Sequence, residues 1–457
     1  MSISYFDFLA QKAPKTIMRG IEPEPMPSHL FDFQRECIAH NLRCGSAGLF
    51  LDTGLGKTAC ELEYARQGGE ATNGKSLIFT PLAVARQVER EGLRWDYDCH
   101  VIKRQEDVRE GINIINYDRL HLIDPSVFGA VVLDEGSIIK GLNGKTSKAL
   151  IQAFDGCKFK LPATATPAPN DHMEIGQYSE FCSIMPMHEM LMRWFTHDSG
   201  KTSAWRLKHH GAADFFAWMA SWSRMAQMPS DLGYSDDDFR LPELKIHTIH
   251  AEQSAIVGGD LFGDAPVTAT EMHNVKRQTA EARAKEAAEL VTGLPNDPWV
   301  LWCDTDYEAD ALMRILKGIP GVAEVRGSHS SDCKESTLLD FADGVIRVLV
   351  TKSSICGFGL NWQFCANTAF VGRSFSYESW YQAIRRFWRF GQKRIVNCYV
   401  IVAQGENAIG RVIDRKADDH MMMKSAMRKA MRQAIESSAS QKIPYSPKHN
   451  GRIPAWL

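Results

Sequence analysis

The segment LFLDTGLGKTACELEYA combines glycines, a lysine and a threonine in an order that suits phosphate binding. Its apolar beginning predicts a buried strand, its end predicts a helix, and a glycine-containing turn joins the two. Gly54 and Gly56 let backbone N–H groups approach phosphate oxygens. Lys57 can reach the β- and γ-phosphates of a nucleotide, and Thr58 can offer its hydroxyl to Mg²⁺. The strict P-loop pattern begins with glycine where this chain has Leu51, so the match is to the shorter GxGKT form.

An acidic pair in the segment AVVLDEGS could supply the chemistry that accompanies a bound phosphate. The apolar run Ala130–Leu133 predicts a strand that delivers Asp134 at its end. Asp134 is suited to hold Mg²⁺ through water, and Glu135 can orient or deprotonate the attacking water. Alone, the pattern also fits a strand that simply ends in an acidic turn. Its place downstream of the phosphate loop, in the same predicted sheet, favours the catalytic interpretation.

The segment WYQAIRRFWRFGQKR carries five cations and five large aromatic side chains within fifteen positions. On a helix that turns by ~100° per residue, Gln382, Arg386 and Arg389 share one stripe. The large apolar side chains on the opposite side are Ile384, Phe387 and Trp388. A solvated basic helix is the simplest interpretation, but such a helix needs no large aromatic side chains on the face opposite its cations. We therefore expect this one to be clamped to a core and to present two guanidinium groups and an amide in a fixed direction.

Two more turns follow predicted strands, in LPATATPAPND and in TKSSICGFGLNWQ. Each is an ordinary turn when taken by itself. The residues of interest in these turns are Thr164, Thr166, Asn170, Gly357 and Gly359.

Short apolar runs alternate with helical patterns in two separate parts of the chain. This alternation predicts parallel α/β sheets with functional residues at the carboxyl ends of the strands. The predicted strands are AGLFLDTG, KSLIFTPL, INIINYD and GAVVLDEG in the first part, and PWVLWCDTD, VAEVRG, IRVLVTKSS, NTAFVG and NCYVIVA in the second. The predicted division is an N-terminal α/β lobe (1–175), a helical insertion rich in Trp and Met (176–290), a C-terminal α/β lobe (291–410) and a basic helical tail (411–457).

Composition limits the classes of protein that the chain can represent. A length of 457 residues predicts two or three domains, and the formal net charge of −2 argues against a histone-like coating protein. The eleven cysteines form no CxxC pair or cluster with metal-ligand spacing, which indicates free thiols in a reducing compartment. The start of the chain lacks a signal-peptide layout, and no run approaches the ~18 apolar residues of a membrane span. We expect a cytoplasmic protein of a bacterial or phage-infected cell.

Taken in order, these segments resemble the motifs of the superfamily 2 helicase-type ATPases, and within them the Snf2-like branch, over roughly residues 30–400. QAIRRFWRFGQ is the most specific segment, because it nearly matches the signature Q-A-x-x-R-x-x-R-x-G-Q. ATATPAPND with a Trp-rich insertion is most similar to phage or prophage Snf2-type helicases. The resemblance implies two RecA-like lobes, ATP and Mg²⁺ as cofactors, and an ATPase that nucleic acid stimulates.

The resemblance also implies roles for individual residues. The catalytic residues would be Lys57, Glu135, Arg386 and Arg389, the two arginines acting as fingers that reach from the second lobe into a nucleotide held by the first. The nucleotide-binding residues would further include Gln34 (the adenine-reading position), Thr53, Gly54, Leu55, Gly56, Thr58, Gly359 and Gln382. Thr58 and Asp134 would bind Mg²⁺. Residues that couple the nucleotide to nucleic acid or contact nucleic acid would be Thr80, Ser137, Thr164, Thr166 and Asn170.

The chain departs from the family pattern at three positions. Ser137 stands where the family often has His, so it can form a hydrogen bond but cannot carry charge. Ala165 replaces a usual glycine and could stiffen its turn. Arg385 replaces a common acidic residue, and we expect its extra charge to face nucleic acid or solvent.

The resemblance favours a DNA helicase or translocase that moves along nucleic acid, duplex DNA in particular, without sequence specificity. Backbone contacts carry no sequence information, so binding should be sensitive to salt. Candidates for the tracking surface are Thr80, Arg86, Lys140 and the cations of the insertion. An RNA helicase shares every motif, and an ATP-switched recruitment module that hardly moves is a third alternative. We find no nuclease motif in the sequence.

Other features of the insertion and tail have simpler interpretations. A second Gly-Lys-Thr at positions 200–202 follows no predicted strand, so we do not interpret it as a phosphate loop. The tryptophans of the insertion are better explained as core than as base-stacking platforms. The insertion or the basic tail could bind a protein partner, and we expect a monomeric motor.

Overall fold

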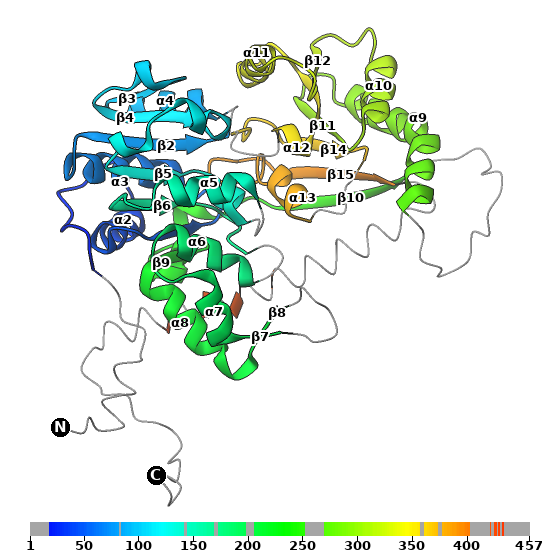
Figure 1. Ribbon diagram of the computed structural model, residues 1–457. Coiled ribbons are helices and arrows are strands. Elements are labelled where there is room, and N and C mark those ends of the chain that lie inside the picture. The colour runs from blue at the N-terminus through cyan, green and yellow to red at the C-terminus, as the bar shows by residue number, and fades with distance from the viewer. Residues whose placement is uncertain are drawn as a thin grey trace, which may run out of the picture.

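The computed structural model describes residues 18–81, 84–140, 144–168, 172–197, 205–251, 269–356, 361–372 and 377–402, with a few positions between 421 and 433. Within them the fold is α/β, with helices flanking parallel sheets, as predicted and as expected for two RecA-like lobes (Figure 1). The basic tail and the second Gly-Lys-Thr lie almost wholly outside the described residues.

The first sheet has five parallel strands in the order β3-β4-β2-β5-β6. Their bounds are Lys75–Thr80 (β2), Cys99–Val101 (β3), Gly111–Asn116 (β4), Ala130–Leu133 (β5) and Phe159–Pro162 (β6). β1 (Gly48–Leu51) lies beside β6 through two isolated bridges and pairs in parallel with β9 (Ser223–Ala226). We call β1–β6, β9 and their helices lobe one. The helical prediction for 223–226 is wrong, because the main chain of these residues pairs with β1.

The second sheet has six strands in the order β10-β15-β14-β11-β13-β12, and all of its pairs are parallel. Their bounds are Leu244–His250 (β10), Trp299–Cys303 (β11), Val322–Val325 (β12), Val348–Lys352 (β13), Asn367–Phe370 (β14) and Val396–Val402 (β15). We call this sheet and its helices lobe two. β10 falls within the range predicted as helical insertion. It escaped detection because it is a half-exposed edge strand without a continuous apolar run.

Helices cover both sheets and fill the segment between them (Figure 1). Those before the second sheet are α2 (Asp32–Cys44), α3 (Lys57–Glu70), α4 (Ala85–Arg94), α5 (Lys145–Ala153), α6 (Ile175–Phe181), α7 (Met187–Trp194) and α8 (Ala212–Trp222). Those of lobe two are α9 (Ala269–Gly293), α10 (Asp306–Ile315), α11 (Ser331–Ala342), α12 (Ser353–Cys356) and α13 (Tyr377–Ile384).

The segment with α7 and α8 is not purely helical. An antiparallel hairpin of β7 (Phe195–His197) and β8 (Trp205–Leu207) lies between the two helices, so the helix predicted over 205–207 is a strand. Three tryptophans of this segment, Trp194, Trp218 and Trp222, pack against one another in the interior. Their interpretation as core is therefore confirmed.

Candidate functional site

The glycine-containing loop has the predicted strand–turn–helix structure, since β1 ends at Leu51 and α3 begins at Lys57. Gly54 and Gly56 both have positive φ (92° and 74°), which side chains disfavour. A Cβ on Gly56 would lie 2.3 Å from Nε2 of Gln34, and one on Gly54 would lie 2.8 Å from the backbone N of Phe390 in lobe two. Glycine is therefore required by conformation and by space at both positions.

The N-terminus of α3 has no side-chain cap among the described residues and carries Lys57 and Thr58, which favours an anion. Nζ of Lys57 donates a hydrogen bond to the Leu51 carbonyl (3.1 Å), across the mouth of the loop. Burial lowers the pKa of Lys57, while the charges of Glu135 and Glu61 oppose this shift. The loop thus places a cation beside carboxylates.

The acidic pair follows β5 as predicted, and both of its side chains are buried. Burial, and after it the charge of Glu135, raise the pKa of Asp134 to about 7. Glu135 has a φ of +50°, and its Oε2 has no hydrogen-bond partner among the described residues. Within those residues no three His, Cys, Asp or Glu side chains form a metal cluster. A Mg²⁺ ion here would therefore take its remaining ligands from the Thr58 hydroxyl, water and a bound anion, as Mg²⁺ commonly does.

The basic segment after α13 differs from its prediction in local structure. The helix ends at Ile384, so the predicted helical stripe is wrong, and turns carry Arg386 and Arg389. Beyond Ile384 the Arg386 N–H donates to the Ala383 carbonyl in a tighter turn, and the Arg386 carbonyl accepts a hydrogen bond from the Trp362 N–H. The side chain of Gln392 likewise donates to the next carbonyl, that of Phe387.

These turns nevertheless bring polar side chains of lobe two to the loop and acids of lobe one. Nη2 of Arg386 lies 3.6 Å from Oε1 of Glu135, and Arg386 is 2% exposed. Gln382 donates through Nε2 to Oγ1 of Thr166 (3.3 Å). Ile384 and Phe387 are buried in the core of lobe two, as predicted for the apolar back.

The guanidinium group of Arg389 has a hydrogen-bond donor that is not paired among the described residues. Its Nε is buried and has no hydrogen-bond partner in the part of the chain that the structure describes. Burial, and then the neighbouring Arg386, lower the pKa of Arg389 to about 10, so it remains charged at neutral pH. The charges of Glu91 and Glu135 oppose this shift only in part, so an anionic ligand at this position would further stabilise the guanidinium.

Arg385 does not face nucleic acid or solvent, so that expectation is wrong. It is 6% exposed and donates through Nη2 to the Thr53 carbonyl of the glycine-containing loop (2.6 Å). The sequence pattern missed this contact because it depends on how the two lobes meet.

The remaining predicted residues lie at different depths around the loop. Gln34 is buried and donates to the Leu55 carbonyl while accepting from the Phe31 N–H, so both ends of its amide are occupied. Thr164 and Thr166 are buried and joined by a hydrogen bond (3.1 Å). Ser137 and Thr80 are buried as well. Asn170, Gly357 and Gly359 and the side chain of Lys140 lie outside the described residues.

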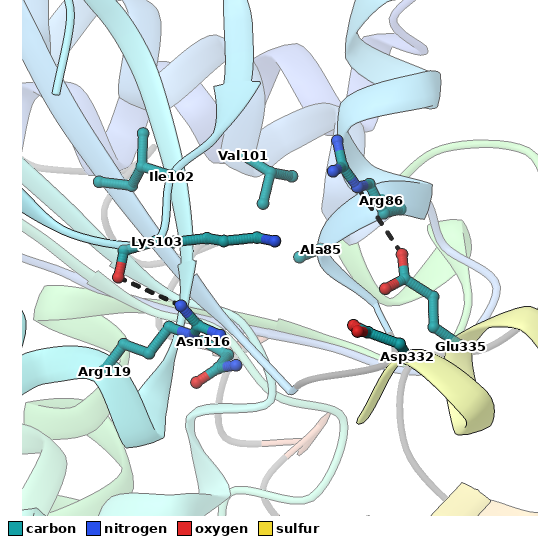
Figure 2. A pocket seen from close by; sticks show the side chains of 9 residues that line it. All are labelled: Ala85, Arg86, Val101, Ile102, Lys103, Asn116, Arg119, Asp332 and Glu335. Carbon is teal, nitrogen blue, oxygen red and sulfur yellow. Dashed lines mark hydrogen bonds and ion pairs between the residues drawn. The ribbon is translucent and has the colours of Figure 1, made fainter. Parts of the chain in front are cut away.

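A second cleft opens between the lobes beside α4, and Figure 2 shows its lining. Lobe one contributes three cations to it, Arg86, Lys103 and Arg119, and α11 of lobe two contributes Asp332 and Glu335. Nε of Arg86 lies 3.7 Å from Oε1 of Glu335. Sequence analysis named Arg86 and missed the other two cations, although each follows the carboxyl end of a strand, β3 or β4. The strand-end rule that found the acidic pair could have found them.

Comparison with known proteins gives weak but consistent similarities, and no family model matches the chain. It is 22% identical over 484 residues to "Putative protein p41" of Acyrthosiphon pisum secondary endosymbiont phage 1, which covers 90% of this chain and all of that protein. It is 28% identical over 176 residues to the DNA repair and recombination protein RAD54B of Mus musculus, and 28% identical over 177 residues to that of Homo sapiens. Each RAD54B match covers 33% of this chain and 19% of the relative.

These similarities support the Snf2-like resemblance at a coarse level, over about a third of the chain, and a relationship to a phage protein. Within the described residues, no helix combines the length and apolar character that a bilayer crossing needs.

Proposed function

We propose that this protein is a nucleic-acid-stimulated ATPase of the Snf2-like type that works as a DNA helicase or translocase. One observation carries the proposal: Arg386 and Arg389 of lobe two lie at the phosphate loop and acidic pair of lobe one. This is the arrangement that hydrolysis between two lobes needs, because cations from one lobe then meet a phosphate group held by the other.

The residues present fit ATP with Mg²⁺. The positive-φ turn at Gly54 and Gly56 leads directly into the N-terminus of α3, and both Oε2 of Glu135 and Nε of Arg389 are buried without partners in the described part of the chain. Bound Mg²⁺ would neutralise phosphate charge. Lys57 and the N-terminus of α3 would bind the phosphates, with Thr58 and Asp134 on the metal side.

Glu135 would orient or deprotonate the attacking water. Arg386 and Arg389 would stabilise the negative charge that spreads over the phosphoryl oxygens in the transition state. Gln382, through its hydrogen bond to Thr166, would link this site to the turn after β6.

Nucleic acid would bind mainly through its phosphates along the inter-lobe face that contains the second cleft. The cations Arg86, Lys103 and Arg119 line this cleft (Figure 2), and phosphate contacts give binding that depends on salt and not on sequence. The similarity to a DNA repair and recombination protein favours DNA over RNA.

The test is the steady-state ATPase rate alone and with duplex DNA, single-stranded DNA or RNA, for the wild type and for Lys57→Ala. We expect duplex DNA to stimulate most and Lys57→Ala to lose the stimulated rate, because the phosphates lose their main cation. Greatest stimulation by RNA would favour an RNA helicase. Stimulated hydrolysis without displacement of a triplex strand would favour a recruitment switch. A stimulated rate that survives Lys57→Ala would overturn the proposal.

Two substitutions in the second cleft should shift DNA affinity in opposite directions. Arg119→Ala removes a phosphate contact, so we expect uniformly weaker binding and a salt slope reduced by about one. Glu335→Gln removes a negative charge that faces the same path and competes for Arg86, so we expect tighter binding. Fluorescence anisotropy with labelled duplex across a salt series measures both effects. The exposed Arg314, on α10, supplies Arg314→Ala as a control that should change neither quantity. If all three variants have the same DNA affinity and the same salt slope, the second cleft does not bind DNA.

A further inference from the structure

Two side chains of lobe two, Tyr381 and Arg385, bind the first residues of the phosphate loop directly. The Tyr381 hydroxyl donates to the Asp52 carboxylate, at 3.0 and 3.2 Å from its two oxygens. Arg385 donates through Nη2 to the Thr53 carbonyl (2.6 Å) and through Nε to the Thr53 hydroxyl. Nη2 of Arg385 also lies 3.6 Å from Oδ1 of Asp52. Asp52, Thr53 and Arg385 are all buried.

The same carboxylate also shapes the loop from within. The backbone N–H of Thr53 donates to Oδ1 of Asp52 (2.7 Å), immediately before the positive-φ turn at Gly54. Asp52 therefore accepts hydrogen bonds both from its own loop, through the N–H and hydroxyl of Thr53, and from lobe two. Any movement of lobe two away from lobe one must break buried, charge-assisted hydrogen bonds to the loop, which are stronger than neutral ones.

Arg385 is held in place on its own side of this contact. Its guanidinium carbon lies 5.1 Å from the ring centre of Trp388 and 5.9 Å from that of Tyr381, both within cation–π range. Nε1 of Trp388 in turn donates to the Pro242 carbonyl (2.6 Å). A carboxylate at position 385 would face Asp52 and the Thr53 carbonyl with like charge, so this contact requires a cation.

We propose that Arg385 and Tyr381 are positioning residues that couple closure of the two lobes to the shape of the phosphate loop. The proposal rests on the proposed ATPase function. Arg385 acts through Thr53 and leaves the reacting phosphate to Arg386 and Arg389. Closure orders the loop for phosphate, and bound phosphate in turn favours closure, because the two events share the Asp52–Thr53 contact.

The experiment combines nucleotide kinetics with a distance measurement between the lobes. Arg385→Ala should raise the KM for ATP by about tenfold, equivalent to about 1.4 kcal/mol, and leave kcat nearly unchanged at saturation, because the interaction lost is made before the chemical step. Arg385→Lys should recover part of the loss, and Arg385→Glu should exceed it. The exposed Arg394→Ala, nearby in the same segment, is the matched control and should leave KM unchanged.

Fluorescence transfer between labels at Ala71→Cys in lobe one and the exposed Cys333 in lobe two reports closure without any hydrolysis. Arg385→Ala should need more ATP analogue to reach the closed signal. Tyr381→Phe removes only a hydroxyl, and it tests the same contact if the arginine variants fold poorly. The double variant Asp52→Asn with Arg385→Ala should raise the KM for ATP by less than the product of the two single effects, because both residues act through the same contact.

Unchanged closure and KM in both Arg385→Ala and Tyr381→Phe, or strict additivity with Asp52→Asn, would overturn the inference. A wild type that closes on nucleotide with this dependence on Arg385 but does not hydrolyse ATP would instead overturn the proposed function and retain the coupling.

Discussion

Glu135→Gln is expected to lower the ATPase rate by about 10²–10⁴-fold, the range that a positioned general base contributes, while ATP still binds. The substitution keeps the size and hydrogen-bonding reach of the side chain and removes its negative charge. Oε2 of Glu135 is buried without a partner in the described residues, and Oε1 lies 3.6 Å from Arg386. The charge is thus held where an attacking water would need an acceptor.

The backbone at Glu135 supports this assignment. A non-glycine residue at positive φ costs of order 1–3 kcal/mol and persists only where its surroundings enforce it. Here the Asp134 N–H donates to the Phe79 carbonyl (2.9 Å) and the Gly136 N–H donates to the Ala163 carbonyl (2.7 Å). The two neighbouring strands therefore fix the residue from both sides, and the strained conformation aims its side chain toward the inter-lobe site.

Phosphate release at saturating ATP, together with binding of a fluorescent ATP analogue, separates loss of chemistry from loss of binding in Glu135→Gln. The control is Glu189→Gln, an equal change on an exposed side chain of α7, which should leave the rate unchanged. If Glu135→Gln hydrolyses ATP at the wild-type rate, another residue activates the water.

The features that could be predicted from the sequence are those that a short, continuous run of residues determines. The sequence predicted strand β5 with the acidic pair at its end, and the glycine-containing loop between β1 and α3. In each case the apolar run and the turn after it are contiguous in the chain. The parallel α/β fold class followed from the same alternation of strands and helices.

What escaped prediction depends on non-local pairing. Residues 223–226 form a strand through their pairing with β1. Beyond Ile384, the Arg386 and Phe387 carbonyls accept hydrogen bonds from the distant Trp362 N–H and the Gln392 side chain. Arg385 looked free because the residues it binds lie more than 300 positions earlier in the chain. Helical spacing still grouped Gln382, Arg386 and Arg389, although turns, and not a helix, bring them to lobe one.

Arg389→Ala is expected to lower ATP hydrolysis by about 10³–10⁵-fold, the range for loss of an arginine finger, and to leave DNA affinity nearly unchanged. Arg389 lies near Arg386 and does not line the second cleft, and its Nε is buried and has no partner in the described residues. Its pKa of about 10 keeps it charged at neutral pH. The nearby charges of Glu91 and Glu135 offset only part of the cost of burying this cation, and a bound anion would offset more of it.

Arg389→Lys should recover little, since an ammonium group preserves the charge but not the planar, two-pronged donor geometry. Arg394→Ala is the matched control, because Arg394 lies in the same segment, is exposed and pairs with Asp297 instead of facing the loop. ATPase rate and duplex anisotropy measured on the same preparations decide between two interpretations of this basic segment. Lost hydrolysis with intact affinity identifies a finger, whereas lost affinity with intact hydrolysis would make Arg389 part of a nucleic-acid-binding patch. The burial of Arg389 beside Arg386 and Glu135 predicts the first result.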